Sequence, residues 1–254
     1  MFPYIAQPVL EIAGQRFYAF GALVALALLV GCWFFMRRAR REHLDQRFAR
    51  IFIVSVAAVA FFVSHALKVV IYAPMLLREK PWSVLDASQD MYSFGGLVGG
   101  VLTAAWLMHR YRVSPRDRWR YLDNLAFAFT VGWIFGRAGC SLSHDHIGVP
   151  SNSLLAVRFP GGSRYDLGLL ELIFTGLLAA VFFRLDRRPR PPGLFLGLFF
   201  LTYGIFRVWR DQLEVDVHRF LGSSPDQLFA VVSVAAGALI LVKLARERQV
   251  RAVA

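Results

Sequence analysis

Long apolar stretches separated by short polar connections make up most of this chain. A helix needs about 20 mostly apolar residues to cross the hydrocarbon of a bilayer. Seven segments are apolar enough to be predicted as crossings, and they run at about 17–36, 51–73, 93–109, 122–140, 167–184, 193–210 and 227–244. The pattern therefore predicts an all-α integral membrane protein with seven transmembrane helices.

Basic residues gather in every second connection between the predicted helices. Short connections rich in arginine and lysine stay on the cytoplasmic side of a membrane. The basic residues concerned are Arg37, Arg38, Arg40, Arg41, Arg47 and Arg50; Arg110, Arg112, Arg116, Arg118 and Arg120; Arg184, Arg187, Arg188 and Arg190; and Lys243, Arg246, Arg248 and Arg251. We therefore expect the N-terminus outside, the C-terminus in the cytoplasm, and the connection at about 141–166 on the exoplasmic side.

The composition agrees with a membrane protein and speaks against nucleic acid as a partner. Apolar residues make up 57% of the chain and charged residues 18%, whereas soluble proteins have roughly 45–50% and 25%. The net charge of +12 is divided among the connections instead of covering one face. No internal repeat divides the sequence, so we expect a single membrane domain over residues 1–254. The chain also lacks the basic start of a cleavable signal peptide.

Arg137 is the residue that fits least well into its apolar surroundings. A guanidinium in hydrocarbon costs at least about 2.5–3.5 kcal/mol, so such a residue is expected to be functional. His144, Asp145 and His146 follow shortly after it in the sequence. A permanent cation beside two imidazoles at the edge of a bilayer suggests a site for an anion, and the anion expected there is a lipid phosphate.

Two further segments carry charged residues in or beside predicted crossings. Arg207 and Asp211 are four residues apart, so they share a helix face and can form an ion pair. The functional alternative is that Arg207 is a second cation for a phosphate, oriented by its carboxylate. Glu171 lies near the start of the fifth crossing, where pairing with a cation is the simpler interpretation and substrate binding the alternative.

Smaller signals have both structural and functional interpretations. Tyr18 could be an aromatic anchor at the membrane interface. Gly95 and Gly96 could serve helix packing or the close approach of a head group. Cys140 could be a small apolar residue, or a nucleophile beside His144. The two histidines and Asp145 lack a clear further ligand, so we expect no metal site.

Four segments together resemble the prolipoprotein diacylglyceryl transferase family. They are Phe17-Tyr18; Ser93-Phe94-Gly95-Gly96-Leu97-Val98-Gly99; Gly136-Arg137-Ala138-Gly139-Cys140 with the continuation to Gly148; and Tyr203-Gly204-Ile205-Phe206-Arg207 with Asp211. The resemblance implies seven crossings in the orientation given above, in the inner membrane of a bacterium. It also implies transfer of a diacylglyceryl group from phosphatidylglycerol to the lipobox cysteine of a prolipoprotein signal peptide, without a cofactor.

The chain departs from the family pattern at several positions. Phe94 stands where the family has a histidine proposed as a base, and Cys140 stands where it has an asparagine. Asp145 replaces a glutamate, and Ser64-His65 replaces a Gly-Arg pair. The anion-binding residues are thus kept, while the base has to come from another position.

The resemblance suggests roles for the candidate residues. Arg137 and Arg207 would hold the phosphate, with a hydrogen bond from Tyr18. His144 or His146, oriented by Asp145, would accept the thiol proton. The residues expected to line the substrate site are Arg207, Asp211, Gly95, Gly96, Cys140, Gly148 and Glu171.

Two other functions remain open from the sequence. The chain could be a divergent relative that binds or moves anionic phospholipid in the membrane without forming a thioether. It could also transfer the lipid group to a different acceptor, with Cys140 as a covalent relay.

Overall fold

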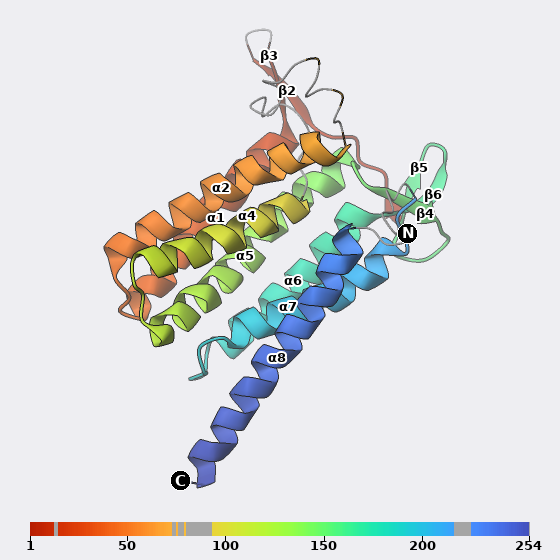
Figure 1. Ribbon diagram of the computed structural model, residues 1–254. Coiled ribbons are helices and arrows are strands. Elements are labelled where there is room, and N and C mark those ends of the chain that lie inside the picture. The colour runs from red at the N-terminus through yellow and green to blue at the C-terminus, as the bar shows by residue number, and fades with distance from the viewer. Residues whose placement is uncertain (13–14, 73–74, 76–78, 80–92, 216–224, 254) are drawn as a thin grey trace. The chain divides into compact units, whose positions relative to one another are not determined.

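The computed structural model describes residues 1–12, 15–72, 75, 79, 93–215 and 225–253, and helices predominate among them (Figure 1). Each apolar stretch predicted from the sequence forms a helix. The helices are α1 (Ala19–Arg41), α2 (Gln46–Tyr72), α4 (Ser93–Arg110), α5 (Pro115–Ser143), α6 (Leu167–Leu185), α7 (Leu194–Asp211) and α8 (Pro225–Val253).

Five helices in the described part of the chain are long and apolar enough to cross a membrane. They are α1, α2, α5, α6 and α8. Helix α7 ends in charged residues, and α4 contains four glycines and ends in His109 and Arg110. The protein is therefore a helical integral membrane protein with several crossings.

Short strands form at one end of several helices, and the expectation of an all-α fold missed them. They are β1 (Phe2–Pro3), β2 (Val9–Ile12), β3 (Gln15–Tyr18), β4 (Ile147–Pro150), β5 (Ala156–Phe159) and β6 (Gly162–Asp166). One sheet has the order β1-β5-β6-β4, and β2 and β3 form a hairpin. Tyr18 consequently ends β3 instead of lying inside the first helix, which begins at Ala19.

The described chain divides into two compact units. The first contains residues 1–35 and 123–254, and the second contains residues 36–122. The expectation of one membrane domain stays a prediction.

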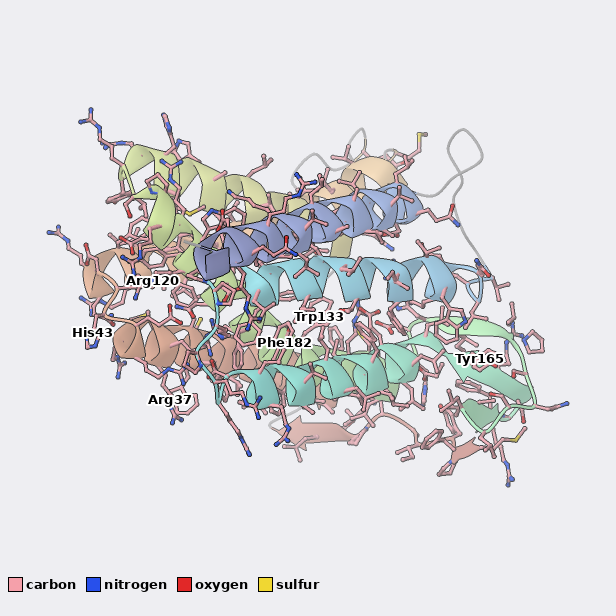
Figure 2. The ribbon with its side chains drawn as sticks, turned by 90° about the horizontal axis from the view of Figure 1, so that it is seen from below. Arg37, His43, Arg120, Trp133, Tyr165 and Phe182 are labelled. Carbon is pink, nitrogen blue, oxygen red and sulfur yellow. The ribbon has the colours of Figure 1, made fainter. Side chains whose placement is uncertain are left out.

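In the second unit, α2 packs closely on α4 because α4 has glycine at the contact. A Cβ atom on Gly95 would lie 2.7 Å from the carbonyl oxygen of Val63, so a side chain has no room there. Arg37, His43 and Arg120 lie toward one end of this unit (Figure 2). Among them, Arg120 lies 2.9 Å from Asp117, which belongs to the first turn of α5.

The first unit combines α7, α8, α6 and most of α5 with both sheets. Glycine allows α7 and α8 to approach each other, since a Cβ on Gly204 would lie 2.8 Å from the carbonyl oxygen of Ala230. Phe127, Phe182 and Phe195 form an aromatic core, with ring centroids 4.6–6.0 Å apart. Figure 2 shows Phe182 among these helices.

The N-terminus of α7 is capped by a residue from another helix. Gly193, at the N-cap position, has no side chain that could accept a hydrogen bond. Asp123 of α5 takes this role, because its Oδ1 accepts from the backbone N–H groups of Phe195 at 2.7 Å and Leu196 at 3.1 Å. Arg190 balances the charge of this carboxylate at 2.9 Å. The contact fixes α7 against α5 at the end opposite the charged cluster described below.

Residues 144–166, which we call the arm, connect α5 to α6 through β4, β5 and β6. The arm binds the N-terminal segment through the parallel pair β1–β5. It also binds the end of α7, because Val149 donates a backbone hydrogen bond to Leu213 at 2.9 Å. A Cβ atom on Gly148 would lie 2.7 Å from the same Leu213 oxygen, so this contact requires glycine.

Candidate functional site

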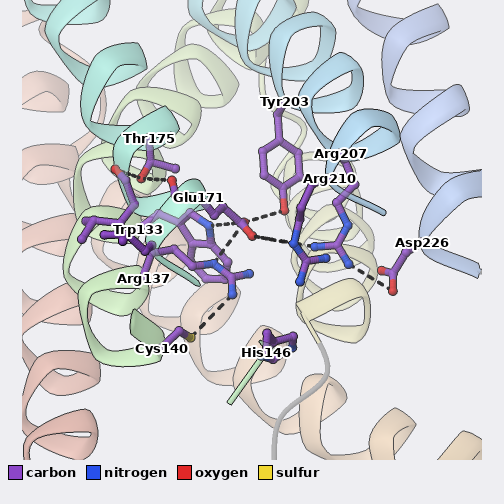
Figure 3. A network of polar contacts seen from close by, with 12 residues as sticks. Trp133, Arg137, Cys140, His146, Glu171, Thr175, Tyr203, Arg207, Arg210 and Asp226 are labelled. Atoms are coloured by element: carbon purple, nitrogen blue, oxygen red, sulfur yellow. Dashed lines mark hydrogen bonds and ion pairs between the residues drawn. The ribbon is translucent and has the colours of Figure 1, made fainter. Parts of the chain in front are cut away.

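A buried carboxylate on α6, that of Glu171, is the centre of a polar cluster inside the first unit (Figure 3). Its Oε1 accepts hydrogen bonds from the indole N–H of Trp133 at 3.1 Å and from the hydroxyl of Tyr203 at 3.0 Å. The Nε atom of Arg137 lies 3.0 Å from the same oxygen. Three helices, α5, α6 and α7, therefore converge on one acceptor.

Two guanidinium groups of α7 approach the other oxygen of this carboxylate. Arg207 Nη1 and Arg210 Nε each lie 3.8 Å from Glu171 Oε2. Both side chains are buried, as is that of Arg137. Three permanent positive charges thus gather around one negative charge, a concentration that an apolar interior tolerates only with compensating groups.

Further carboxylates surround the two arginines of α7. Arg207 lies 3.1 Å from Asp211 and 3.1 Å from Asp226 of α8. Arg210 lies 3.3 Å from Asp211 and 3.2 Å from Glu214. We use the name guanidinium cluster for these residues together with Arg137 and Glu171.

Arg137 also links the cluster to the end of α5. Its guanidinium lies 4.5 Å from the centroid of the Trp133 ring, a cation–π contact. Its Nη1 atom donates to the sulfur of Cys140 at 3.5 Å. The Cys140 thiol is in turn hydrogen-bonded to Asp145, the second residue of the arm. The candidate residues Arg137, Cys140 and Asp145 are therefore connected by direct contacts in the structure.

Asp145 and His146 form a carboxylate–imidazole pair. The Nδ1 atom of His146 lies 2.9 Å from Asp145 Oδ1, and both side chains are about one-third exposed. Burial acts to raise the pKa of the Asp145 carboxyl, but His146 and Arg137 together hold it below its usual value. The backbone of His146 is fixed as well, because its carbonyl accepts from Leu167 at 2.9 Å. Figure 3 shows His146 on the Cys140 side of the cluster.

His144 has quite different surroundings. Its Nδ1 atom lies 2.5 Å from Asp166, and its Nε2 atom lies 3.0 Å from the carbonyl oxygen of Ile5. Its ring stacks on Tyr4 at 4.8 Å and meets Phe159 edge-on at 5.1 Å. Both ring nitrogens are thus engaged within the protein, and His144 joins the N-terminal segment to the arm.

The remaining predicted residues lie at several places. Asp211 belongs to the guanidinium cluster, and Gly148 lies at the junction of the arm with the end of α7. Tyr18 ends the β2–β3 hairpin with half of its surface exposed. Gly95 and Gly96 belong to the second unit, where they face Val63 and Ser64 of α2.

Sequence reasoning did not identify five members of this site: Trp133, Tyr203, Arg210, Glu214 and Asp226. A periodic signal existed for two of them. Tyr203, Arg207 and Arg210 follow one another at spacings of four and three residues, which places them on one face of α7. Trp133 carried no comparable signal, because a tryptophan in an apolar stretch is normal for a membrane helix.

The site combines cations and hydrogen-bond donors with carboxylates that pair with the cations. Within the described residues, no three His, Cys, Asp or Glu side chains are grouped so that they could hold a metal ion. The chemistry available is the recognition of an anion by arginine and proton transfer by the Asp145–His146 pair.

Comparison with known proteins gives a consistent result. Residues 7–243 match the model of a family described as prolipoprotein diacylglyceryl transferase. The chain is 25% identical to the phosphatidylglycerol–prolipoprotein diacylglyceryl transferase of Mannheimia succiniciproducens over 90% of its own length and 89% of the relative. It is 27% identical to the protein of the same name from Nitratidesulfovibrio vulgaris, over 81% and 79% of the two chains.

Higher identity is confined to shorter alignments. The chain is 33% identical to the protein of the same name from Glaesserella parasuis over 119 residues, which are 44% of this chain and 43% of the relative. In this and similar matches the chain spans about half the length of the curated relatives, or somewhat less.

Proposed function

Because the chain belongs to the prolipoprotein diacylglyceryl transferase family, we propose that it transfers a diacylglyceryl group from phosphatidylglycerol to the lipobox cysteine of a prolipoprotein signal peptide. The observation that carries the proposal is the convergence of Arg137 and Arg207 on Glu171, at 3.0 Å and 3.8 Å. Two guanidinium groups from separate helices thereby face one place, as recognition of a phosphate requires.

In the proposed reaction, the cysteine sulfur attacks the glyceryl carbon that is bonded to the phosphate ester oxygen. A carbon–sulfur bond forms, the carbon–oxygen bond breaks, and glycerol phosphate leaves with the bonding electrons. Arg137 and Arg207 stabilise the negative charge of the leaving group. Both are held in position before the substrate arrives, so the stabilisation requires little reorganisation during the reaction.

The thiol proton needs an acceptor, because a free cysteine with a pKa of about 8.5 is mostly protonated at neutral pH. We assign this role to His146, since its Nδ1 atom lies 2.9 Å from the Asp145 carboxylate and its Nε2 atom remains to receive the proton. His144 is the weaker candidate, because Asp166 and Ile5 engage its ring. His146 would thus replace the family histidine for which this chain has Phe94.

The other candidate residues have supporting roles in this proposal. Cys140 and Asp211 orient Arg137 and Arg207, with which they are in contact. Gly148 holds the arm against α7. Tyr18 would hydrogen-bond to the phosphate, whereas Gly95 and Gly96 of the second unit allow α4 to pack closely on α2. No cofactor is required for this chemistry.

The proposed topology has seven crossings, and two backbone contacts support it. Strand β1 pairs with β5, so the N-terminal segment and the arm lie on the same side of the membrane. An even number of crossings would then separate them, which favours a crossing by α4 in addition to α1, α2 and α5. Val149 likewise binds Leu213 after α7, which favours crossings by both α6 and α7.

The alternation of basic connections then gives the direction of these crossings. With arginine-rich connections in the cytoplasm, the arm and the N-terminus lie outside and the C-terminus lies inside. In a bacterium this topology puts the guanidinium cluster toward the outer leaflet of the inner membrane. Signal peptides exported through that membrane could then present their cysteine to the site.

The family assignment does not favour the two alternatives raised by the sequence. A protein that only moves lipid does not need the oriented Asp145–His146 pair. A relay through Cys140 would have to break the stable thioether that it had formed. Transfer to an external thiol in one step avoids this intermediate.

Mass spectrometry of a lipobox peptide, incubated with phosphatidylglycerol and the purified protein, tests the proposal directly. The wild-type protein should add the mass of one diacylglyceryl group to the peptide, and Arg137→Ala should abolish the addition. Arg158→Ala, which alters an exposed residue of β5, provides a matched control and should remain active. An unmodified peptide with the wild-type protein, or full activity of the Arg137→Ala variant, would contradict the proposal.

A further inference from the structure

Asp226 differs from the other carboxylates that contact Arg207. The side chains of Glu171 and Asp211 are at most 1% exposed, whereas that of Asp226 is 17% exposed. Asp211 lies one turn from Arg207 on α7 itself, and its burial leaves it little room to withdraw. Asp226 lies in the first turn of a different helix, α8. It is therefore the partner that can most easily move away.

The charges of the guanidinium cluster require that some carboxylate moves when an anion binds. Three guanidinium groups, those of Arg137, Arg207 and Arg210, contact four carboxylates in the described part of the chain. These carboxylates belong to Glu171, Asp211, Glu214 and Asp226. A phosphate added to this arrangement would be a fifth negative group, and the repulsion would be strong in a site with little water.

The atoms of Arg207 indicate which of its own carboxylate partners a phosphate would replace. Its Nε atom is engaged by Asp211, and its Nη2 atom is engaged by Asp226, both at 3.1 Å. Glu171 is a looser neighbour of Nη1, at 3.8 Å. Arginine binds phosphate most strongly through two parallel N–H···O bonds. The edge formed by Nη1 and Nη2 is suited to such a contact once Asp226 has moved.

We propose that Asp226 is a positioning residue that occupies the phosphate-binding edge of Arg207 and is displaced by an anionic phospholipid. The inference rests on the proposed function and adds one step to it, in which the lipid phosphate competes with Asp226 for Arg207. After displacement the carboxylate remains in the first turn of α8, where the helix dipole stabilises a negative charge. Its movement away from Arg207 therefore costs less than the loss of an isolated buried ion pair.

The proposal has a direct consequence for affinity. A ligand that binds only the fraction of molecules with a free site has its apparent affinity reduced by that fraction. Asp226 competes in this way with the lipid phosphate and, after the reaction, with glycerol phosphate. Removal of its charge should tighten the binding of both, whereas the loss of a purely structural ion pair would weaken binding or leave it unchanged.

The experiment compares wild-type protein with Asp226→Asn in detergent micelles that contain phosphatidylglycerol. We expect Asp226→Asn to lower the KM for phosphatidylglycerol and the inhibition constant of glycerol phosphate by roughly two- to fivefold, the range of a partly exposed ion pair. The kcat should not rise in parallel. Asp226→Glu, which keeps the charge, should behave like the wild type. Glu247→Gln removes a carboxylate from an exposed ion pair of the same helix and should leave both constants unchanged.

An unchanged or higher KM in folded Asp226→Asn would overturn the inference, as would an equal decrease in Asp226→Glu. Asp226→Ser removes the same charge and provides the test if the asparagine variant does not fold. Direct binding of phosphatidylglycerol, measured against binding of neutral diacylglycerol, tests the proposed function and the role of Asp226 separately. A wild-type protein without a preference for phosphatidylglycerol would refute the proposed function. A wild-type preference that Asp226→Asn does not strengthen would refute the present inference alone.

Discussion

His144 and His146 are separated by one residue, yet their surroundings predict different roles. His146 pairs with Asp145 and is partly exposed, while His144 is bonded at both ring nitrogens. We expect His146→Ala to lower kcat/KM by about 10²–10⁴-fold, the usual contribution of a general base. The rate of peptide modification, followed by mass spectrometry over a range of pH, provides the measurement.

His144→Ala is the matched variant for this prediction. It should reduce the thermal stability of the protein more than the rate of the chemical step, because it removes contacts within the arm. Wild-type turnover in His146→Ala, or a loss confined to His144→Ala, would refute the assignment of the base.

Glu171 compensates three guanidinium groups in a buried site, so its charge should matter for stability. Glu171→Gln keeps an acceptor for Trp133 and Tyr203 but leaves the arginines without their central negative charge. Removal of one partner of a buried ion pair typically costs about 3–5 kcal/mol. We expect a loss of this size in the free energy of unfolding, measured in detergent. Equal stability of the two proteins would show that the other carboxylates suffice.

At the residue scale, the sequence predicted the charged members of the site better than their neighbours. Arg137 was recognisable because a permanent cation is costly in an apolar stretch. Trp133 was not recognisable, because aromatic residues are ordinary in such stretches, whereas the spacing of Tyr203 to Arg207 and Arg210 was a usable signal. Asp226 comes from a helix that is remote in sequence, and only the folded chain brings it to Arg207.

At the scale of elements, the contacts of His144 help to hold the N-terminal segment with β1 to the arm, and their strength depends on protonation. The partners of the His144 ring, Asp166 and the carbonyl of Ile5, are both acceptors when Asp166 is ionised. A neutral imidazole has a single N–H group, so it can donate to only one of these two acceptors. The second hydrogen bond requires one more proton, shared by the imidazole and the carboxylate. Burial raises the pKa of Asp166 above its usual value, although the hydrogen bond with His144 acts against the rise.

This shift gives the pH dependence its sign. Between the ordinary pKa of aspartate and the raised value, the folded protein keeps a proton that the unfolded chain has lost. Stability from this contact is thus full at low pH and falls as the pH rises through that window. We expect amide protection of β1 and Ile5, measured by hydrogen exchange, to decrease accordingly.

Asp166→Asn is the control for the pH prediction. The amide can still accept from Leu169, which Asp166 caps at 2.9 Å, but it does not titrate. The protection of β1 should therefore lose its pH dependence in this variant. The same dependence in both proteins would exclude Asp166 as the titrating group.

The sequence predicted the helices well and the strands not at all, for physical reasons. A crossing helix needs many consecutive apolar residues, and that requirement leaves a clear pattern. Strand β1 has two residues and pairs with β5, which lies more than a hundred residues later in the chain. Such a strand is too short for an alternating pattern, and its partner depends on the fold. For the same reason the sequence pattern did not reveal β3, and Tyr18 was predicted to lie in the first helix.

At the scale of the whole molecule, the proposed topology puts the arm outside the cell and the connection between α4 and α5 inside it. Labelling of single cysteines in intact cells tests this prediction. Gly161→Cys in the arm should react with a maleimide that cannot enter cells, because the arm should lie outside. Arg112→Cys, between α4 and α5, should react only after the membrane is permeabilised. Labelling of both positions from outside would show that α5 does not cross between them.

The capping of α7 by Asp123 bears on how the protein is made. Helix α7 begins beside Gly193, which has no side chain to cap it, and the carboxylate that does so belongs to α5. Ribosomes synthesise α5 first, so the capping group is already present when α7 emerges. A chain in which the order of these two helices was reversed, as in a circular permutant, would release α7 with bare N–H groups. With the present order of synthesis, a capping carboxylate is available when the N-terminus of α7 inserts into the membrane.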